Sequence, residues 1–404
     1  MTKTLLEQIR SGRGDNGSGK WPLRLAAGVT ALVLALPAAA GSREQAKRMH
    51  DRLTGVQPTA QVLDRMETEI TNVDPTAAAM IAMDGPNNPN SKYFYTVTLK
   101  NFATPWTNEA QDVFAPLNDY TALVIGMIRD DVPFNQLLSA SFTYVGDPGL
   151  GLSPVSPGNN DHYAELEANG IDLSLKANLD QAPQTIAAPA GVFTTRAAAR
   201  AFFIDGTNRA MFRFTLLNHL CKDMEEVNDP TGTPDRIRQD ASRSPGGDSR
   251  IFMNSCIGCH IGMDPMTQAF AYYDFVYTAG NEDAGQLVYT PNLVQPKYLI
   301  NANNFKSGYV TPNDNWDNYW RSGPNANLGW DSTLSGSGSG AASMGAELAN
   351  SVAFARCQVT KAYRSVCLGE PDQSQVDTLL TAYNTNNKSM KQVFASAATQ
   401  CMGD

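Results

Sequence analysis

The chain has 404 residues, which is enough for one large domain or for two to three smaller ones. Charged residues make up 18% and hydrophobic residues 42% of it, a composition that excludes an intrinsically disordered protein. The formal net charge of −9 at pH 7 repels nucleic acid and anionic lipid, so we expect no nucleic acid among the partners.

Residues 1–40 have the pattern of a secretory signal peptide. Lys20 and Arg24 lead into an apolar run over 25–36, and Ala38-Ala39-Ala40 supplies an Ala-x-Ala cleavage site. The run is short for a membrane span, and no later segment has 18 consecutive apolar residues. The polar lead before the run is unusually long, so a membrane anchor is the alternative if the signal is not cleaved. We predict a periplasmic or extracellular protein.

Cleavage would make the mature chain more acidic. Residues 1–40 contain five of the 31 basic and two of the 40 acidic residues, which leaves 26 and 38 and a net charge of −12. Such a surface favours a basic partner protein, although solubility alone also explains it.

We predict an N-terminal helical domain over 41–190. The segment 93–99 is aromatic and β-branched, and it fits a short strand or part of a helix. Residues 146–160 are rich in Gly, Pro, Ser and Asn and therefore form a loop. Apolar residues at helical spacing and cap signals predict helices over 43–54, 62–70, 74–83 and 118–128.

The next predicted helices cover 196–203 and 210–224, and a polar loop over 228–249 follows them. Arg209 and Arg213 lie four residues apart where the second helix begins. Two arginines at this spacing fit either a pair that binds carboxylates of a ligand or ordinary exposed helix residues.

The polar loop ends at Cys256-Ile257-Gly258-Cys259-His260, which has the spacing of c-type haem attachment. In such a site each thiol is joined to one vinyl group of the porphyrin, and the histidine binds the iron from one face. We predict one covalently attached haem c, with Cys256, Cys259 and His260 as the cofactor-binding residues. This chemistry takes place outside the cytoplasm, in agreement with the signal peptide.

Three other interpretations compete for this pair of cysteines. Zinc needs four ligands, usually as two spaced pairs, and the remaining Cys and His residues are scattered singly. A thioredoxin-like redox pair follows a strand in a βαβ unit, and no such pattern surrounds the motif. A plain disulfide or two buried thiols is the third.

His260 is the predicted proximal iron ligand. The sequence does not identify the distal ligand, for which there are three alternatives. Met344 follows a Gly/Ser-rich loop and precedes a helix, where a chain can return across a haem. His219 lies one helix upstream of the motif and is the other candidate, and the third alternative is an unoccupied distal side or a different ligand. In this context Arg209 and Arg213 are candidates for holding the haem propionates.

Behind the motif, Pro265 predicts the start of a helix over 265–275 whose aromatic residues fit either a wall for a porphyrin or ordinary core. Residues 282–345 are loop-rich, with a flexible Ser-Gly repeat over 335–340. They complete a predicted haem c domain over 191–345. A C-terminal helical domain over 346–404 follows, with helices predicted over 344–366, 372–383 and 390–398.

Four cysteines outside the motif allow three disulfide pairings. Cys357 and Cys367 share one predicted helix, where ten residues separate them by roughly 15 Å, beyond the reach of a disulfide. Cys401 is therefore expected to pair with one of these two, and Cys221 with the other.

Several segments resemble the planctomycete-type cytochrome c-like domain families, which are exported bacterial proteins mostly of unknown function. The matching segments are Gly191–Thr195, Gly206–Arg209, Cys256–His260 with Met263-Asp264-Pro265 behind it, Phe354–Cys357 with Tyr363 and Gly369, and His50–Val56. The resemblance covers most of 45–404 in patches. It implies a mostly helical fold and a c-type haem at Cys256, Cys259 and His260, but no reaction. The chain lacks the additional haem motifs and domains of larger members.

Together these patterns predict a mostly α fold in which a cytochrome c-like haem region is embedded in a larger helical protein with a loop-rich insert. The expected function is one-electron transfer by an exported monohaem cytochrome to a redox partner protein, and no catalytic residue is predicted. The alternatives are a haem enzyme, such as a peroxidase with an open distal site, and a subunit of a larger electron-transfer assembly, which would form an oligomer.

Overall fold

A computed structural model describes residues 40–107, 116–204, 206, 208–299 and 307–403. The predicted signal peptide over 1–40 lies outside the described residues except for Ala40. From residue 40 onward the chain forms one unit.

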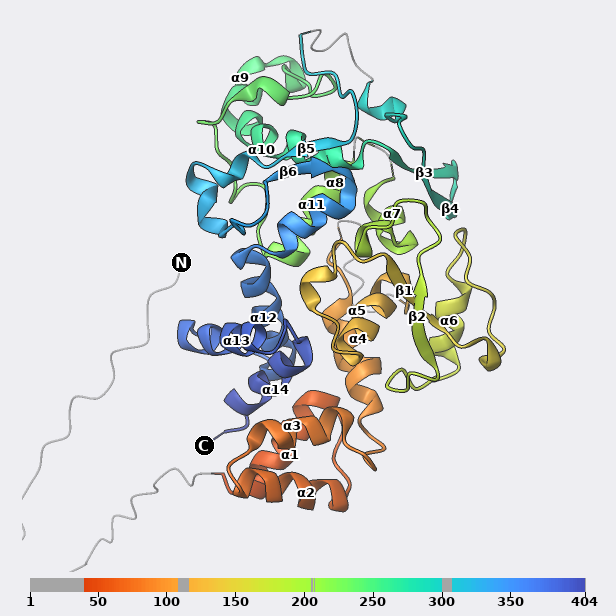
Figure 1. Cartoon of the computed structure of the whole chain (residues 1–404), viewed down its shortest axis with the longest axis vertical. Coiled ribbons are helices and arrows are strands. Elements are labelled where there is room, and N and C mark those ends of the chain that lie inside the picture. Colours follow the sequence, from red (N-terminus) through yellow and green to blue (C-terminus); the bar gives the residue numbers. More distant parts are fainter. Residues whose placement is uncertain (1–39, 108–115, 205, 207, 300–306, 404) are drawn as a thin grey trace, which may run out of the picture. The chain divides into compact units, whose positions relative to one another are not determined.

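The described part of the chain is mostly helical, as predicted, with small two-stranded sheets between the helices (Figure 1). The α-helices are α1 (Ser42–Thr54), α2 (Ala60–Thr71), α3 (Pro75–Asp84), α4 (Leu99–Ala103), α5 (Asp119–Arg129), α6 (Asp161–Ala168), α7 (Arg196–Phe202), α8 (Arg209–Thr215), α9 (Ser249–Ile251), α10 (Ile257–Thr267), α11 (Gly340–Ala349), α12 (Val352–Cys367), α13 (Gln373–Thr385) and α14 (Met390–Gln400). The strands are β1 (Phe142–Gly146), β2 (Leu179–Pro183), β3 (Tyr273–Thr278), β4 (Asn281–Tyr289), β5 (Asn315–Asp317) and β6 (Ser337–Ser339).

Local signals placed the N-terminal helices correctly. The carboxylate of Asp74 accepts a hydrogen bond from Ala77 N, and Pro75 occupies the first turn of α3. The side chain of Asn118 accepts from Thr121 N and starts α5, which is buried along nearly its whole length. The segment 93–99, which fitted either a strand or a helix, is helical: a π-turn over Phe94–Thr98 continues into α4.

The two ends of the described chain pack against each other. Helix α14 contacts α3, α12 and α13, and α1 contacts α14 and α12 (Figure 1). Polar contacts cross the same boundary, because Arg52 donates to Cys367 O at 2.6 Å and Gln45 donates to Gly403 O at 2.9 Å. One hydrophobic core runs from the first helix to the last.

The prediction of a helix over 265–275 is wrong. Helix α10 begins earlier, at Ile257, contains Pro265 and ends at Thr267, and β3 then pairs antiparallel with β4. Tyr273 and Phe275 point inward whereas Val276 is exposed, which is the two-residue period of a strand rather than the period of a helix.

Two further predictions are corrected. The Ser-Gly repeat is not wholly loop, because Ser337–Ser339 forms β6 and pairs with β5. The helix predicted over 344–366 is two helices, because Ser351 interrupts it and its hydroxyl accepts from Phe354 N to cap α12.

Two disulfides link α12 to other parts of the chain, one to the π-turn after α8 and one to the C-terminal end of α14. Cys221 is bonded to Cys357 and Cys367 to Cys401, which is one of the two pairing patterns that the sequence left open. Cys357 and Cys367 do share one helix, as predicted. Among the described helices, none has the length and apolar character needed to cross a membrane.

Candidate functional site

The candidate motif lies within a continuous helical stretch that runs from Ser249 through a π-turn at Phe252–Cys256 into α10. Cys256 ends the π-turn, and Cys259 and His260 occupy the first turn of α10. Gly258 is required between them, because a Cβ at this position would collide with the side chain of Asn228.

The two motif cysteines are free thiols, and both are partly exposed. The other four cysteines of the chain are all in disulfides. Cys259 Sγ lies 3.4 Å from Met224 O, and burial raises the pKa of its thiol. Cys256 packs at the edge of a small apolar cluster that includes Phe252. The two cysteines are therefore not bonded to any other cysteine and are partly exposed.

His260 presents one ring nitrogen to the protein and leaves the other free. Its side chain is 18% exposed, and its ring lies 5.8 Å from that of Phe252. Nδ1 lies 3.1 and 3.2 Å from the two carboxylate oxygens of Asp264. Among the described residues, none hydrogen-bonds Nε2. Because an ionised carboxylate only accepts hydrogen bonds, Nδ1 donates to Asp264, and Nε2 is the ring nitrogen that remains for a ligand.

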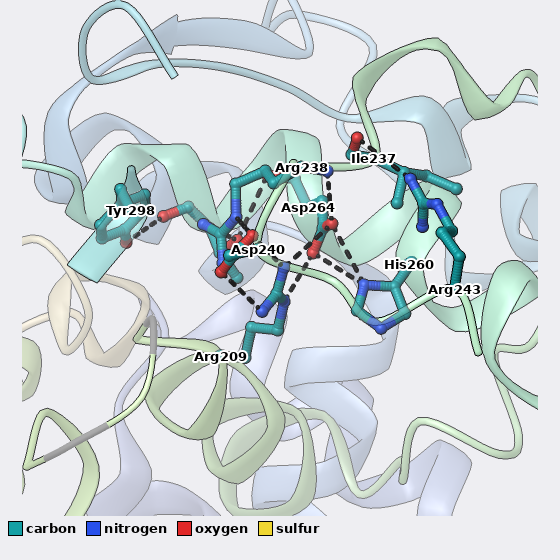
Figure 2. A network of polar contacts seen from close by, with 9 residues as sticks. Arg209, Ile237, Arg238, Asp240, Arg243, His260, Asp264 and Tyr298 are labelled. Carbon is teal, nitrogen blue, oxygen red and sulfur yellow. Dashed lines mark hydrogen bonds and ion pairs between the residues drawn. The ribbon is translucent and has the colours of Figure 1, made fainter. Parts of the chain in front are cut away.

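Asp264 is a fully buried carboxylate with several donors around it (Figure 2). Arg209 donates Nε to Oδ1 at 2.8 Å and an Nη to Oδ2 at 3.2 Å, and the backbone N of Arg238 donates to Oδ2 at 3.0 Å. Burial acts to raise the pKa of Asp264, but the charge of Arg209, followed by the contact with His260 and the charge of Arg238, holds it well below its ordinary value. The carboxylate is therefore ionised and fixed in place.

A second carboxylate completes this network (Figure 2). Arg209 also donates to both oxygens of Asp240, at 3.0 Å each, and Arg238 Nε donates to Asp240 at 3.3 Å. The guanidinium of Arg238 lies 4.4 Å from the ring centroid of Tyr298. Two arginines thus balance two aspartates in the interior behind His260.

The predicted distal ligands lie in other environments. Met344 is completely buried in the main core, on α11. His219 lies in a π-turn after α8, its Nε2 is 2.7 Å from the hydroxyl of Tyr120, and its ring stacks on those of Tyr120 and Phe354. Burial lowers the pKa of His219 well below its ordinary value. No described hydrogen bond or ring contact joins either residue to His260, so the distal ligand stays a prediction.

The two arginines that were candidates for holding haem propionates form ion pairs with aspartates of the protein. Arg209 lies between Asp240 and Asp264, and Arg213 pairs with both oxygens of Asp223 at 2.8 Å. The aromatic residues behind the motif are core: Phe270 is fully buried and packs edge-on against Phe193 and Phe203.

Sequence reasoning missed the role of Asp264. Its position four residues after His260 on a helix was the available signal, because side chains at this spacing meet. Arg238 and Asp240 had no such signal, since they lie in an irregular segment. Ile251 and Met253 were also missed: they are apolar, 46% and 57% exposed, and lie just before Cys256.

The donor set fits a covalently bound haem. It consists of two accessible thiols and an imidazole nitrogen within one helical segment, with exposed apolar side chains beside it, and no other protein group occupies Nε2 among the described residues. Within the same residues, no group of three or more His, Cys, Asp and Glu side chains is arranged to hold a metal ion. No protein-family model, curated protein or solved structure matches the chain.

Proposed function

We propose that the protein is an exported monohaem c-type cytochrome that transfers single electrons. The observation that carries the proposal is the state of the cysteines. Four are paired, whereas Cys256 and Cys259 stay free on the helical segment that also presents His260. Thioether bonds require free thiols, and iron requires an imidazole with an available nitrogen.

Each residue has a separate role in this proposal. Cys256 and Cys259 hold the porphyrin covalently, and His260 binds the iron through Nε2. The haem supplies an iron that alternates between Fe(II) and Fe(III). The exposed side chains of Ile251 and Met253 provide apolar surface at the attachment point.

The proposal includes a protein family, a cellular compartment and a redox partner. We place the chain with the planctomycete-type cytochrome c-like domain families on the motifs given above, and we place it in the periplasm or outside the cell. The two disulfides support export, because such bonds persist in oxidising compartments. The redox partner is a protein, and the acidic mature chain favours a basic one.

The test is haem attachment in a host that exports the full chain and matures c-type cytochromes. We expect intact-mass and pyridine haemochrome measurements to show one covalent haem in the wild type and none in the double variant Cys256→Ala/Cys259→Ala. The matched control is Cys367→Ala/Cys401→Ala, which also removes two cysteines and should keep the haem. A wild-type protein without covalent haem would contradict the proposal.

A haem enzyme with an open distal side is the second candidate. The observation in its favour is that His219 is engaged by Tyr120 and that Met344 is fully buried. The visible spectrum of the oxidised protein separates the two functions. A low-spin spectrum that becomes high-spin in Met344→Leu or His219→Gln identifies an electron carrier and its ligand, whereas a high-spin wild type that reacts with peroxide supports the enzyme.

A further inference from the structure

The contact between Asp264 and His260 determines both the orientation of the imidazole ring and the basicity of the nitrogen that can bind a ligand. Nδ1 lies 3.1 Å from a carboxylate oxygen of Asp264, which can only accept a hydrogen bond from it, so the contact turns Nε2 away from the carboxylate as the nitrogen that can bind a ligand. A hydrogen bond from an imidazole N–H to a carboxylate also raises the basicity of the opposite nitrogen.

The carboxylate is held too firmly to turn away from the ring. Its side chain is fully buried, and it accepts hydrogen bonds from the guanidinium of Arg209 and the backbone of Arg238 (Figure 2). These donors come from α8 and from the loop before α9, so the tertiary structure fixes the carboxylate on two sides.

We propose that Asp264 is the positioning residue for His260 and that this hydrogen bond lowers the reduction potential of the haem. The inference rests on the proposed function. A more basic imidazole is a stronger donor to iron, and a stronger donor favours Fe(III) over Fe(II). One electron is exchanged with the redox partner for each change between Fe(III) and Fe(II).

Asp240 offers a matched control for the effect of charge alone. Its side chain is 2% exposed, against 0% for Asp264, and it pairs with the same Arg209 and with Arg238, but it makes no described contact with His260. The variants Asp264→Asn and Asp240→Asn each remove one negative charge from the network, and only the first replaces the charged acceptor of the Nδ1–H hydrogen bond by a neutral and weaker one.

The test is a spectroelectrochemical titration of the haem-loaded wild type and both variants, together with the Fe–His stretching band in resonance Raman spectra. We expect Asp264→Asn to shift the Fe(III)/Fe(II) equilibrium at least about tenfold toward Fe(II), which is about 59 mV for one electron. The Fe–His band should move to lower frequency in this variant. Asp240→Asn should give a smaller shift and leave the band in place, and Asp264→Glu should restore most of the wild-type potential.

An unchanged potential and Fe–His band in Asp264→Asn would overturn the inference, as would an equal effect of Asp240→Asn. If Asp264→Asn does not fold, Arg209→Lys takes its place. This variant keeps the charge but loses the two-bond contact, so the carboxylate interacts more strongly with His260 and the potential should fall; no change or a rise would overturn the inference. Each of these outcomes leaves the proposed function intact, whereas a wild type without haem overturns both.

Discussion

Lys361 is a partly buried cation without a carboxylate partner among the described residues. Its ammonium donates to Asn218 O at 3.1 Å and lies 4.9 Å from the ring centroid of Phe102. Burial lowers the pKa of Lys361 to about 8. The folded state therefore carries an energetic penalty for a charged Lys361 that the unfolded chain does not carry.

We expect Lys361→Met to stabilise the protein at pH 7 by about 1 kcal/mol, because it removes a buried charge and keeps the apolar stem. The wild type should also become more stable, relative to the variant, as the pH rises from about 8 towards 10.5, since the folded chain releases the proton before the unfolded chain does. Urea unfolding across this range measures both effects.

The control for this prediction is Lys176→Met, because the side chain of Lys176 is 69% exposed. It should change stability little at any pH in the range. A lower stability of Lys361→Met at pH 7 would contradict the prediction and show that the contact with Asn218 outweighs the cost of burying the charge.

At the scale of elements, α12 connects the parts of the fold. It packs against α13, α14 and α4, and it carries two disulfides, one in its first half at Cys357 and one at its last residue, Cys367. Cys357 joins it to Cys221 at the end of the π-turn after α8, and Cys367 joins it to Cys401 after α14. The sequence separations that these bonds close are 136 and 34 residues.

Removing the longer link should destabilise the protein more. A disulfide stabilises by restricting the unfolded chain, so Cys221→Ala/Cys357→Ala should lower the free energy of unfolding by about 5 kcal/mol and Cys367→Ala/Cys401→Ala by about 3–4 kcal/mol. Denaturant unfolding of the two variants compares them. The reverse order would show that local packing at α14, rather than loop closure, governs the contribution of these bonds.

At the scale of the whole molecule, the proposed export agrees with the disulfides and with the proposed haem attachment. The two disulfides are typical of proteins from oxidising compartments, and the predicted signal peptide and the proposed haem attachment at Cys256 and Cys259 both require export. The first described helix begins at Ser42, directly after the predicted cleavage site.

We expect the exported protein to begin at Gly41. N-terminal sequencing and intact mass of the periplasmic or secreted fraction check this, and chromatofocusing should find the mature chain more acidic than the precursor. A chain of residues 41–404 expressed without the signal should contain neither the disulfides nor covalent haem. Recovery of residues 1–40 on the mature protein in the membrane fraction would instead establish an anchor.

Much of the helical framework was determined by local sequence. Asp74 with Pro75, Asn118 with Thr121, and apolar spacing in α12–α14 act over a few residues, so a helix and its start can be predicted without the rest of the chain. The Cys256–His260 motif was equally readable, because attachment of a haem requires both cysteines and the histidine within five consecutive residues.

Only the tertiary structure determined the ion pairs behind His260, the disulfide partners and the pairing of β3 with β4. Arg209 reaches Asp264 across 55 residues and Asp240 across 31, and no local spacing predicts such pairs. Helix geometry excluded a bond between Cys357 and Cys367, but only packing of α12 beside the π-turn selected Cys221 for Cys357. The strand β3 replaced a predicted helix because β4 was present to pair with it. Capping and periodicity are short-range effects, whereas ion pairs, disulfides and strand pairing depend on which distant segments the hydrophobic core brings together.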